Sequence, residues 1–213
     1  MKLRVIPGVL VGLCLVAGCR SAYYSTMEKF GVYKRDLLKK RVIEARDEQK
    51  AASDQFKDAL TKLRELYNFQ GGELEKAYTS LNREYERSVT RANNVRKRVK
   101  DVETVAGDLF AEWQKEIAQI SSEKLRESSR EKLQETRRRY DELHTALKRA
   151  EQSMAPVLTR FHDQVLFLKH NLNAAAIASL KGETTDIQNE ISRLIADMNA
   201  AITRADSFIS SLP

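Results

Sequence analysis

The residue with the most distinctive chemistry in this sequence is Cys19, one of two cysteines in the chain. Its thiol follows Ala17 and Gly18, whose small side chains leave the backbone before Cys19 open to a peptidase. A cysteine sulfur is nucleophilic once deprotonated, and it can accept a diacylglycerol group as a thioether. We therefore expect cleavage between Gly18 and Cys19 and attachment of lipid at Cys19.

The segment before Cys19 has the three parts of a secretory signal. Lys2 and Arg4 form a basic start, an apolar run covers 5–16, and small residues follow. This run is too short to span a bilayer, which needs roughly 20 apolar residues. The sequence Leu15-Val16-Ala17-Gly18-Cys19 is similar to the lipobox of bacterial lipoproteins. Residues 1–18 are therefore predicted to be a lipoprotein signal peptide, with an ordinary secreted protein as the alternative.

Cleavage before Cys19 changes the charge and the thiol chemistry of the chain. The whole sequence has 37 basic and 30 acidic residues, and losing Lys2 and Arg4 lowers its net charge from +7 by two, to +5. Losing Cys14 leaves no pair of thiols for an intramolecular disulfide. Because Arg20 and not an aspartate follows Cys19, the sorting rule for such lipoproteins favours the periplasmic leaflet of the outer membrane.

No pattern typical of an enzyme or a metal site is found among the other polar residues. A di-iron bundle needs two Glu-x-x-His pairs, and the chain offers only Asp141-x-x-His144. His162 and His170 are about two helical turns apart, a spacing more typical of ordinary polar helix residues. The sequence has no nucleophile elbow and no phosphate-binding glycine loop. We expect no catalytic residue, no metal, and no cofactor besides the lipid on Cys19.

Residues 19–33 are expected to form a lipidated tether next to the membrane. This stretch and the start of the next combine cations with aromatic side chains, a composition that suits a membrane interface. The candidate membrane-surface contacts are Arg20, Tyr23, Tyr24, Lys29, Lys34 and Arg35. The alternative is a plain tether that makes no membrane contact of its own.

Basic residues also gather in the body of the chain. The candidate basic face consists of Arg96, Lys97, Arg98 and Lys100. Acidic residues are interleaved throughout, so solvated helix faces are the more ordinary interpretation of such clusters. Export removes nucleic acid from the expected partners.

The remaining sequence has the apolar repeat of long helices. Glycine and proline are scarce after residue 18, which excludes β-sandwiches, barrels and doubly wound folds. Apolar residues recur by fours and threes from Leu38 to Leu66 and from Leu74 to Ile120, the spacing of a coiled coil. The same spacing continues over 136–161 and 187–212. At 1.5 Å per residue, residues 73–120 alone would span about 70 Å.

Four helical segments with short connections predict antiparallel neighbours. We expect an all-α fold, an elongated antiparallel coiled coil or four-helix bundle with a projecting long helical hairpin, in a single domain over 34–213. Apolar faces satisfied between chains would give the same pattern, so a homo-oligomer stays open.

Local signals predict where these helices end. Gly71-Gly72 separates the first two, the hairpin tip is expected within 121–128 with Ser128 as the next cap, and Gly182 is expected to end the third helix. Thr185 would then cap the last helix, and Pro156 predicts a kink or break near Ala155. The apolar run 165–168 covers most of a helix circumference and is expected to be buried on several sides.

Several stretches resemble a family of uncharacterised bacterial lipoproteins, domain of unknown function 2959. They are the lipobox with Ser21-Ala22-Tyr23-Tyr24, Met27-Glu28-Lys29-x-Gly31, Lys34-Arg35-Asp36, Phe69-Gln70-Gly71-Gly72 and Val165-Leu166-x-Leu168-Lys169-His170-Asn171-Leu172-Asn173. The resemblance implies a helical envelope lipoprotein, and it brings no activity, cofactor or catalytic residue with it.

The sequence thus predicts a non-enzymatic coiled-coil spacer or docking scaffold that faces the periplasm. Its expected partners are membrane lipid and a further envelope protein. The alternative is a module that binds or shapes the membrane surface through its basic faces.

Overall fold

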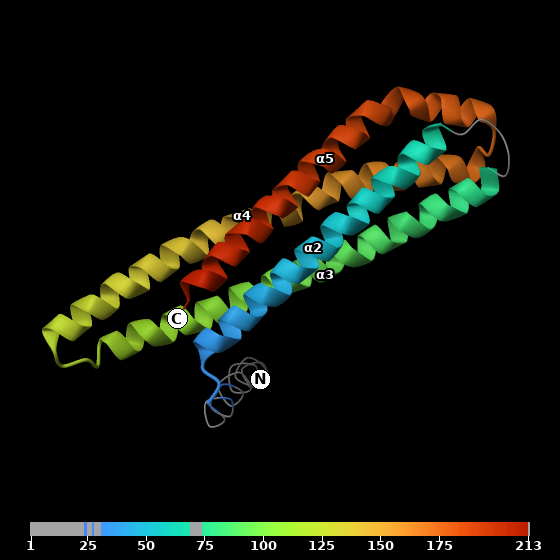
Figure 1. Cartoon of the computed structure of the whole chain (residues 1–213). Helices are drawn as coiled ribbons and strands as arrows, with labels where there is room; N and C mark the ends of the chain where they lie inside the picture. Colours follow the sequence, from blue (N-terminus) through green and yellow to red (C-terminus); the bar gives the residue numbers. More distant parts are fainter. Residues whose placement is uncertain (1–23, 25–26, 28–30, 69–73, 213) are drawn as a thin grey trace, which may run out of the picture.

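The computed structural model of the chain describes Tyr24, Met27, residues 31–68 and residues 74–212. Four helices fill most of these ranges: α2 (Lys34–Tyr67), α3 (Leu74–Ile117), α4 (Glu123–His170) and α5 (Ala174–Ser211). They run up and down along one long axis, and the described residues contain no strand (Figure 1). The expected all-α architecture is confirmed.

Each helix packs against the next one in the chain, and α5 closes the ring by packing against α2. Ion pairs on the flanks mark the antiparallel register of the four interfaces. They are Glu44–Arg98 for α2 and α3, Glu103–His144 for α3 and α4, Arg149–Asp197 for α4 and α5, and Arg46–Asp206 for α2 and α5.

The hairpin of α3 and α4 continues past the ends of α2 and α5 (Figure 1). With 48 residues, α4 is about 72 Å long. We call the place where α2 begins and α5 ends against this hairpin the shoulder, and Lys34, Glu112 and Leu212 mark it. Beyond the shoulder the rod consists of two helices alone, as the sequence predicted.

The core is a continuous column of side chains at the predicted positions. All nine positions of the repeat from Leu38 to Leu66 are buried, and so are all eight from Ile187 to Leu212. Phe56, Phe161 and Phe208 are the largest of these side chains. The regular spacing by fours and threes therefore identified the buried face of both helices correctly.

The predicted start of the third helix is wrong. The helix begins at Glu123 instead of near Ser128, and the connection between α3 and α4 covers 118–122. Ser122 is the N-cap, with its hydroxyl accepting from the Leu125 amide at 3.4 Å. Since residues 123–127 include several good helix formers, the earlier serine can begin the helix, and Ser128 lies inside it.

The predicted break at Gly182 is also wrong. The third helix ends at His170, and α5 runs without interruption from Ala174 through Gly182 and Thr185. Asn173 caps α5 by accepting from the Ala176 amide at 2.9 Å, and Asn171 donates to the Phe167 carbonyl at 2.9 Å. Asparagine side chains satisfy both helix ends here, whereas a glycine inside a helix costs only about 1 kcal/mol.

Pro156 does not break its helix. α4 is continuous across it. Pro156 is exposed, and so is Gln152, whose carbonyl loses its helical partner to the proline ring. Water can therefore bind that carbonyl in place of the missing amide.

Candidate functional site

The described residues hold no group of three or more histidine, cysteine, aspartate or glutamate side chains that could bind a metal ion. No helix within those ranges is long and apolar enough to span a membrane. The predicted lipidation site Cys19 and its neighbours Gly18, Arg20, Tyr23 and Lys29 lie outside the described residues.

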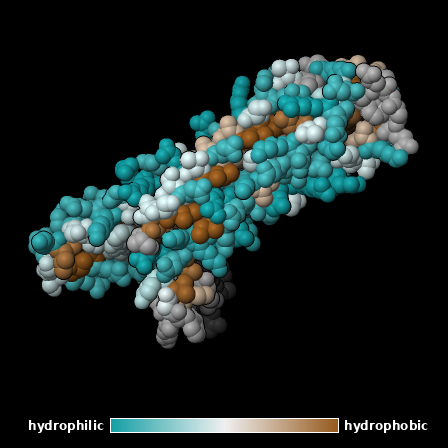
Figure 2. Space-filling view, in the orientation of Figure 1, coloured by the Kyte–Doolittle hydropathy of each residue, from teal (hydrophilic) through white to brown (hydrophobic). Residues whose placement is uncertain are grey.

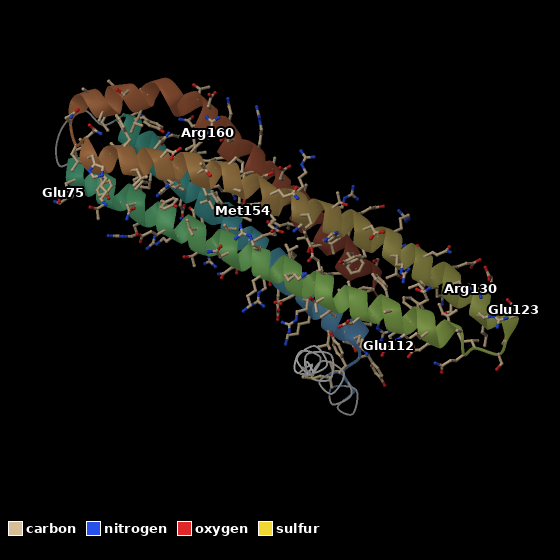
Figure 3. The ribbon with its side chains drawn as sticks, turned by 180° about the vertical axis from the view of Figure 1, so that it is seen from behind. Glu75, Glu112, Glu123, Arg130, Met154 and Arg160 are labelled. Carbon is tan, nitrogen blue, oxygen red and sulfur yellow. The ribbon has the colours of Figure 1, made fainter. Side chains whose placement is uncertain are left out.

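Tyr24 and Lys34, two of the predicted membrane-surface residues, contact α3. The Tyr24 hydroxyl donates to Asp108 Oδ2 at 2.6 Å, and its residue is only 8 % exposed. The Lys34 ammonium lies 4.7 Å from the centre of the Tyr24 ring and forms an ion pair with Glu112, which is labelled in Figure 3. Asp108 and Glu112 are four residues apart on α3, so both carboxylates face the incoming chain.

These four residues, Tyr24, Lys34, Asp108 and Glu112, form what we call the clip. The clip fixes the chain before α2 to the side of α3, within the last three turns of that helix. Of the other predicted membrane contacts, the Arg35 side chain is 48 % exposed, and the neighbouring Tyr33 is 57 % exposed. Sequence reasoning missed the clip because its two carboxylates lie 84 and 78 residues from their partners.

An open pocket of about 640 Å³ lies beside the clip at the shoulder. Tyr33, Leu109, Trp113 and Leu212 contribute its apolar part, and cations and carboxylates from three helices complete its lining. The Trp113 indole donates to Ser129 Oγ at 3.0 Å, which fixes the ring between α3 and α4.

The four residues of the candidate basic face do not form one unpaired positive surface, because three of them lie near carboxylates. Arg98 pairs with Glu44 of α2 at 2.9 Å, whereas Arg96 lies 3.6 Å from Glu151 of α4. Lys100 is close to Glu103 at 3.5 Å, and Lys97 is exposed. Since successive helix residues are about 100° apart, Arg96 and Arg98 must point to different sides, and the spacing already contained this signal.

A second open groove, of about 740 Å³, lies between α4 and α5. Three of its four arginines are paired with carboxylates of the same groove, and the fourth, Arg137, donates to the Phe110 carbonyl and to Gln114. Glu142 accepts from Arg138 at 2.7 Å and lies 3.4 Å from Arg204, while Asp197 pairs with Arg149 at 2.8 Å. The groove is therefore largely neutral, which does not favour an anionic ligand.

The histidines take part in helix packing. His144 Nε2 donates to Glu103 at 2.9 Å and stacks on Tyr140. This hydrogen bond is the main cause that lowers the pKa of Glu103 below its usual value. Burial raises the pKa of Tyr140 to about 12, with the charges of Glu103 and Asp141 adding to it. His162 stacks on Tyr85, and His170 lies in the last turn of α4.

The end of the rod opposite the hairpin exposes apolar side chains. Val165 and Leu168 are buried, but Leu166 and Phe167 are 42 % and 38 % exposed, so the prediction of burial on several sides is wrong for these two. Leu172, in the turn that follows α4, is also exposed. We call Leu166, Phe167 and Leu172 the end patch.

The comparison with protein families covers nearly all of this structure. The model of a family described as protein of unknown function (DUF2959) matches residues 23–212. The chain belongs to this family. The clip, the hairpin and the end patch all lie within the DUF2959 match, and residues 1–22 precede it. No curated protein matches the chain. No solved structure matches it either.

Proposed function

We propose that this DUF2959 protein is a non-enzymatic envelope lipoprotein, anchored by a lipid on Cys19 in the periplasmic leaflet of the outer membrane. It acts as a coiled-coil spacer or docking scaffold that faces the periplasm. The observation that carries the proposal is the arrangement of the rod, in which ion pairs join the helices along the flanks and the exposed large apolar side chains other than Tyr33 lie at the two ends.

The long helices support a geometric role. A helix of about 72 Å holds its two ends at a fixed separation, because the apolar column packs it against neighbours along its length. A scaffold of this kind needs a surface for its partner. The end patch supplies three exposed apolar side chains within seven residues, a composition that suits the centre of a protein interface.

The alternative, a module that binds membranes through basic faces, has less support because basic residues on the flanks are paired with carboxylates. Arg96 and Arg98 are each close to a carboxylate on a neighbouring helix, so a membrane would have to compete with these ion pairs.

Photo-crosslinking in living cells tests the proposal. A photoreactive amino acid replaces Leu166 or Leu172 in the end patch, with Gln152, exposed on the flank of α4, as the matched control position. Further probes are placed along the hairpin over 90–150. We expect one dominant protein adduct in the outer-membrane fraction from the end patch or the hairpin, and none from position 152.

Other outcomes of the same experiment have distinct meanings. Lipid adducts along the whole of 90–150 would support the membrane-shaping alternative instead. Adducts to a second copy of the chain would indicate a homo-oligomer. If Cys19 were unmodified and the protein were recovered from the cytosol, the proposal would be wrong. A Cys19→Ser variant provides the control for anchoring, because it should leave the membrane fraction.

A further inference from the structure

The clip determines where along the rod the predicted anchor is attached. Tyr24 is held at Asp108. At 1.5 Å per residue, Asp108 lies about 51 Å from the first residue of α3 and only about 14 Å from its last. The chain therefore joins the rod near the hairpin tip and far from the end patch.

The length of chain before Tyr24 limits how far the membrane can be from this point. Five peptide units separate Cys19 from Tyr24, and an extended chain of that length reaches about 18 Å at most. A bilayer that holds a lipid on Cys19 thus lies within reach of the hairpin tip. An upright rod can therefore only have its hairpin tip towards the bilayer and its end patch away from it.

The hairpin tip has the composition of a membrane contact. Residues 118–122, Ala-Gln-Ile-Ser-Ser, carry no charge in a chain in which 31 % of residues are charged. Leu125 follows after Glu123 and Lys124 and is 63 % exposed, the highest value among the large hydrophobic side chains that the structure describes as exposed. Figure 2 shows apolar colour at this end of the hairpin.

The side chains around the tip suit a shallow position among lipid headgroups. Ile117 is buried between the two helices and Ile120 is partly buried, so both support the loop from inside. Lys115 and Lys124 are exposed on either side of the loop and can reach lipid phosphates. The carboxylate of Glu123 pairs with Arg126 and that of Glu127 with Arg130, which lowers the repulsion from an anionic surface. Figure 3 labels Glu123 and Arg130 at this end of the hairpin.

We propose that the hairpin tip, residues 117–125, is a second membrane contact. Leu125 inserts among the headgroups of the same bilayer that holds the Cys19 lipid, and the rod stands with its end patch away from the membrane. This inference rests on the proposed function, because it requires a lipid on Cys19. An anchor and a tip contact together hold the rod upright, which a single flexible attachment cannot do.

Site-specific fluorescence in vesicles tests the tip contact. The mature lipidated protein is reconstituted into vesicles of phosphatidylethanolamine and phosphatidylglycerol, with one environment-sensitive dye on a cysteine introduced by Leu125→Cys. Lys100→Cys on the flank and Leu172→Cys in the end patch are the matched positions. Mass spectrometry of the N-terminal peptide first verifies the lipid on Cys19, so failure of the proposed function is detected before the tip is examined.

We expect the dye at position 125 to shift to the blue and to lose most of its intensity to a nitroxide quencher on the lipid headgroups. The dyes at 100 and 172 should stay in water and keep their intensity. If all three dyes were quenched alike, the rod would lie flat, and if none were quenched, the tip would not touch the bilayer. Either result overturns the inference while the lipid anchor stands.

A second pair of variants separates insertion from mere proximity. The dye is moved to the loop by Ala118→Cys, and Leu125 is changed to Asp or to Met. Removing a leucine that inserts among the headgroups should weaken the tip contact by about tenfold or more, so Leu125→Asp should lower quenching at 118 while Leu125→Met retains it. Equal quenching in both variants would contradict a role for Leu125.

Discussion

Gln49 and Ser53 lie one turn apart on α2, and both are at most 1 % exposed. Neither the Gln49 amide atoms nor the Ser53 hydroxyl has a hydrogen-bond partner in the protein. A buried polar group without a partner destabilises the folded state by about 1–3 kcal/mol. Polar residues at core positions of coiled coils are known to fix register at such a cost, which gives these two residues a physical reason to be there.

Replacing Gln49 tests whether this amide destabilises the fold. Gln49→Leu should raise the free energy of unfolding by about 1–2 kcal/mol, because an apolar side chain of similar size leaves nothing unpaired. Urea unfolding followed by circular dichroism measures it. Gln164→Leu is the matched control. Gln164 accepts from the Tyr67 hydroxyl at 2.7 Å in the core, so this variant should lower stability. Equal losses in both variants would show that Gln49 is satisfied after all.

Protonation of Glu103 makes the stability of the α3–α4 contact depend on pH. Its pKa is lowered in the folded protein, first by the hydrogen bond from His144. The folded state therefore binds its proton less readily than the unfolded chain. The resulting stabilisation is complete above the ordinary value of 4.5 and is lost as pH falls below it.

Glu103→Gln should consequently reduce the fall in stability between about pH 5 and pH 3. His144→Leu removes the main cause of the shift and should reduce the fall in a similar way. Urea unfolding across this range compares both variants with the unchanged chain. If the free energy of unfolding fell as steeply with acid in Glu103→Gln as in the unchanged chain, Glu103 would not be a source of this pH dependence.

At the scale of single helices, the apolar repeat was enough to identify the buried faces of α2 and α5 but not the helix ends, and near the end of α3 the buried residues are Phe110 and Ile117 instead of the predicted Leu109 and Glu116. Spacing by fours and threes reports one face of a helix directly, since the same face meets the core at every turn. The ends depend on competition between neighbouring caps. Ser122 caps α4 although Ser128 also has the spacing of a cap, and Asn173 caps α5 although Gly182 predicted a later break. The sequence contains all four signals and does not rank them.

Two features depended on the tertiary arrangement and could not be predicted from local sequence. The partners of Tyr24 and Lys34 come from a different helix, and a composition of aromatics and cations suits a membrane and a carboxylate-bearing helix equally well. Leu166 and Phe167 are exposed because none of the described residues covers that side of α4 at its last turns, which hydrophobicity alone cannot reveal.

Two glycines on the chain have opposite roles, and substitution separates them. Gly107 is inside α3, and a methyl group added there meets no atom within 4 Å. Gly107→Ala should raise the free energy of unfolding by about 0.5–1 kcal/mol, since alanine is the better helix former. Gly31 has a φ of +75°, so Gly31→Ala should be destabilising. Thermal unfolding of both variants measures the difference, and the same sign for both would contradict it.

The whole molecule combines an off-centre attachment with two unlike ends. In a symmetric rod tethered at one tip, the lipid anchor would leave orientation free. The clip shortens the free chain to the residues before Tyr24 and places it near the hairpin. Orientation then depends on contacts at the shoulder that include the Tyr24–Asp108 hydrogen bond, the Lys34–Glu112 ion pair and the packing of the Tyr24 ring under Lys34.

Opening the clip should therefore alter how the rod stands without altering how it is attached. In Tyr24→Ala, the free chain lengthens from five residues to about fourteen, up to Tyr33, and its reach grows from about 18 Å to about 50 Å. The lipid still holds the protein in the vesicle, but the tip is no longer confined to the surface. We expect the dye at position 125 to lose its blue shift while the protein still floats with the vesicles.

Tyr33→Ala is the matched control, because Tyr33 is an exposed aromatic residue on the same segment that takes no part in the clip. It should leave the fluorescence at 125 unchanged, and thermal unfolding of both variants verifies that the bundle is intact. If Tyr24→Ala kept the blue shift, the hairpin would find the membrane by its own affinity. The clip would then serve to pack the chain before α2 against α3 rather than to orient the rod.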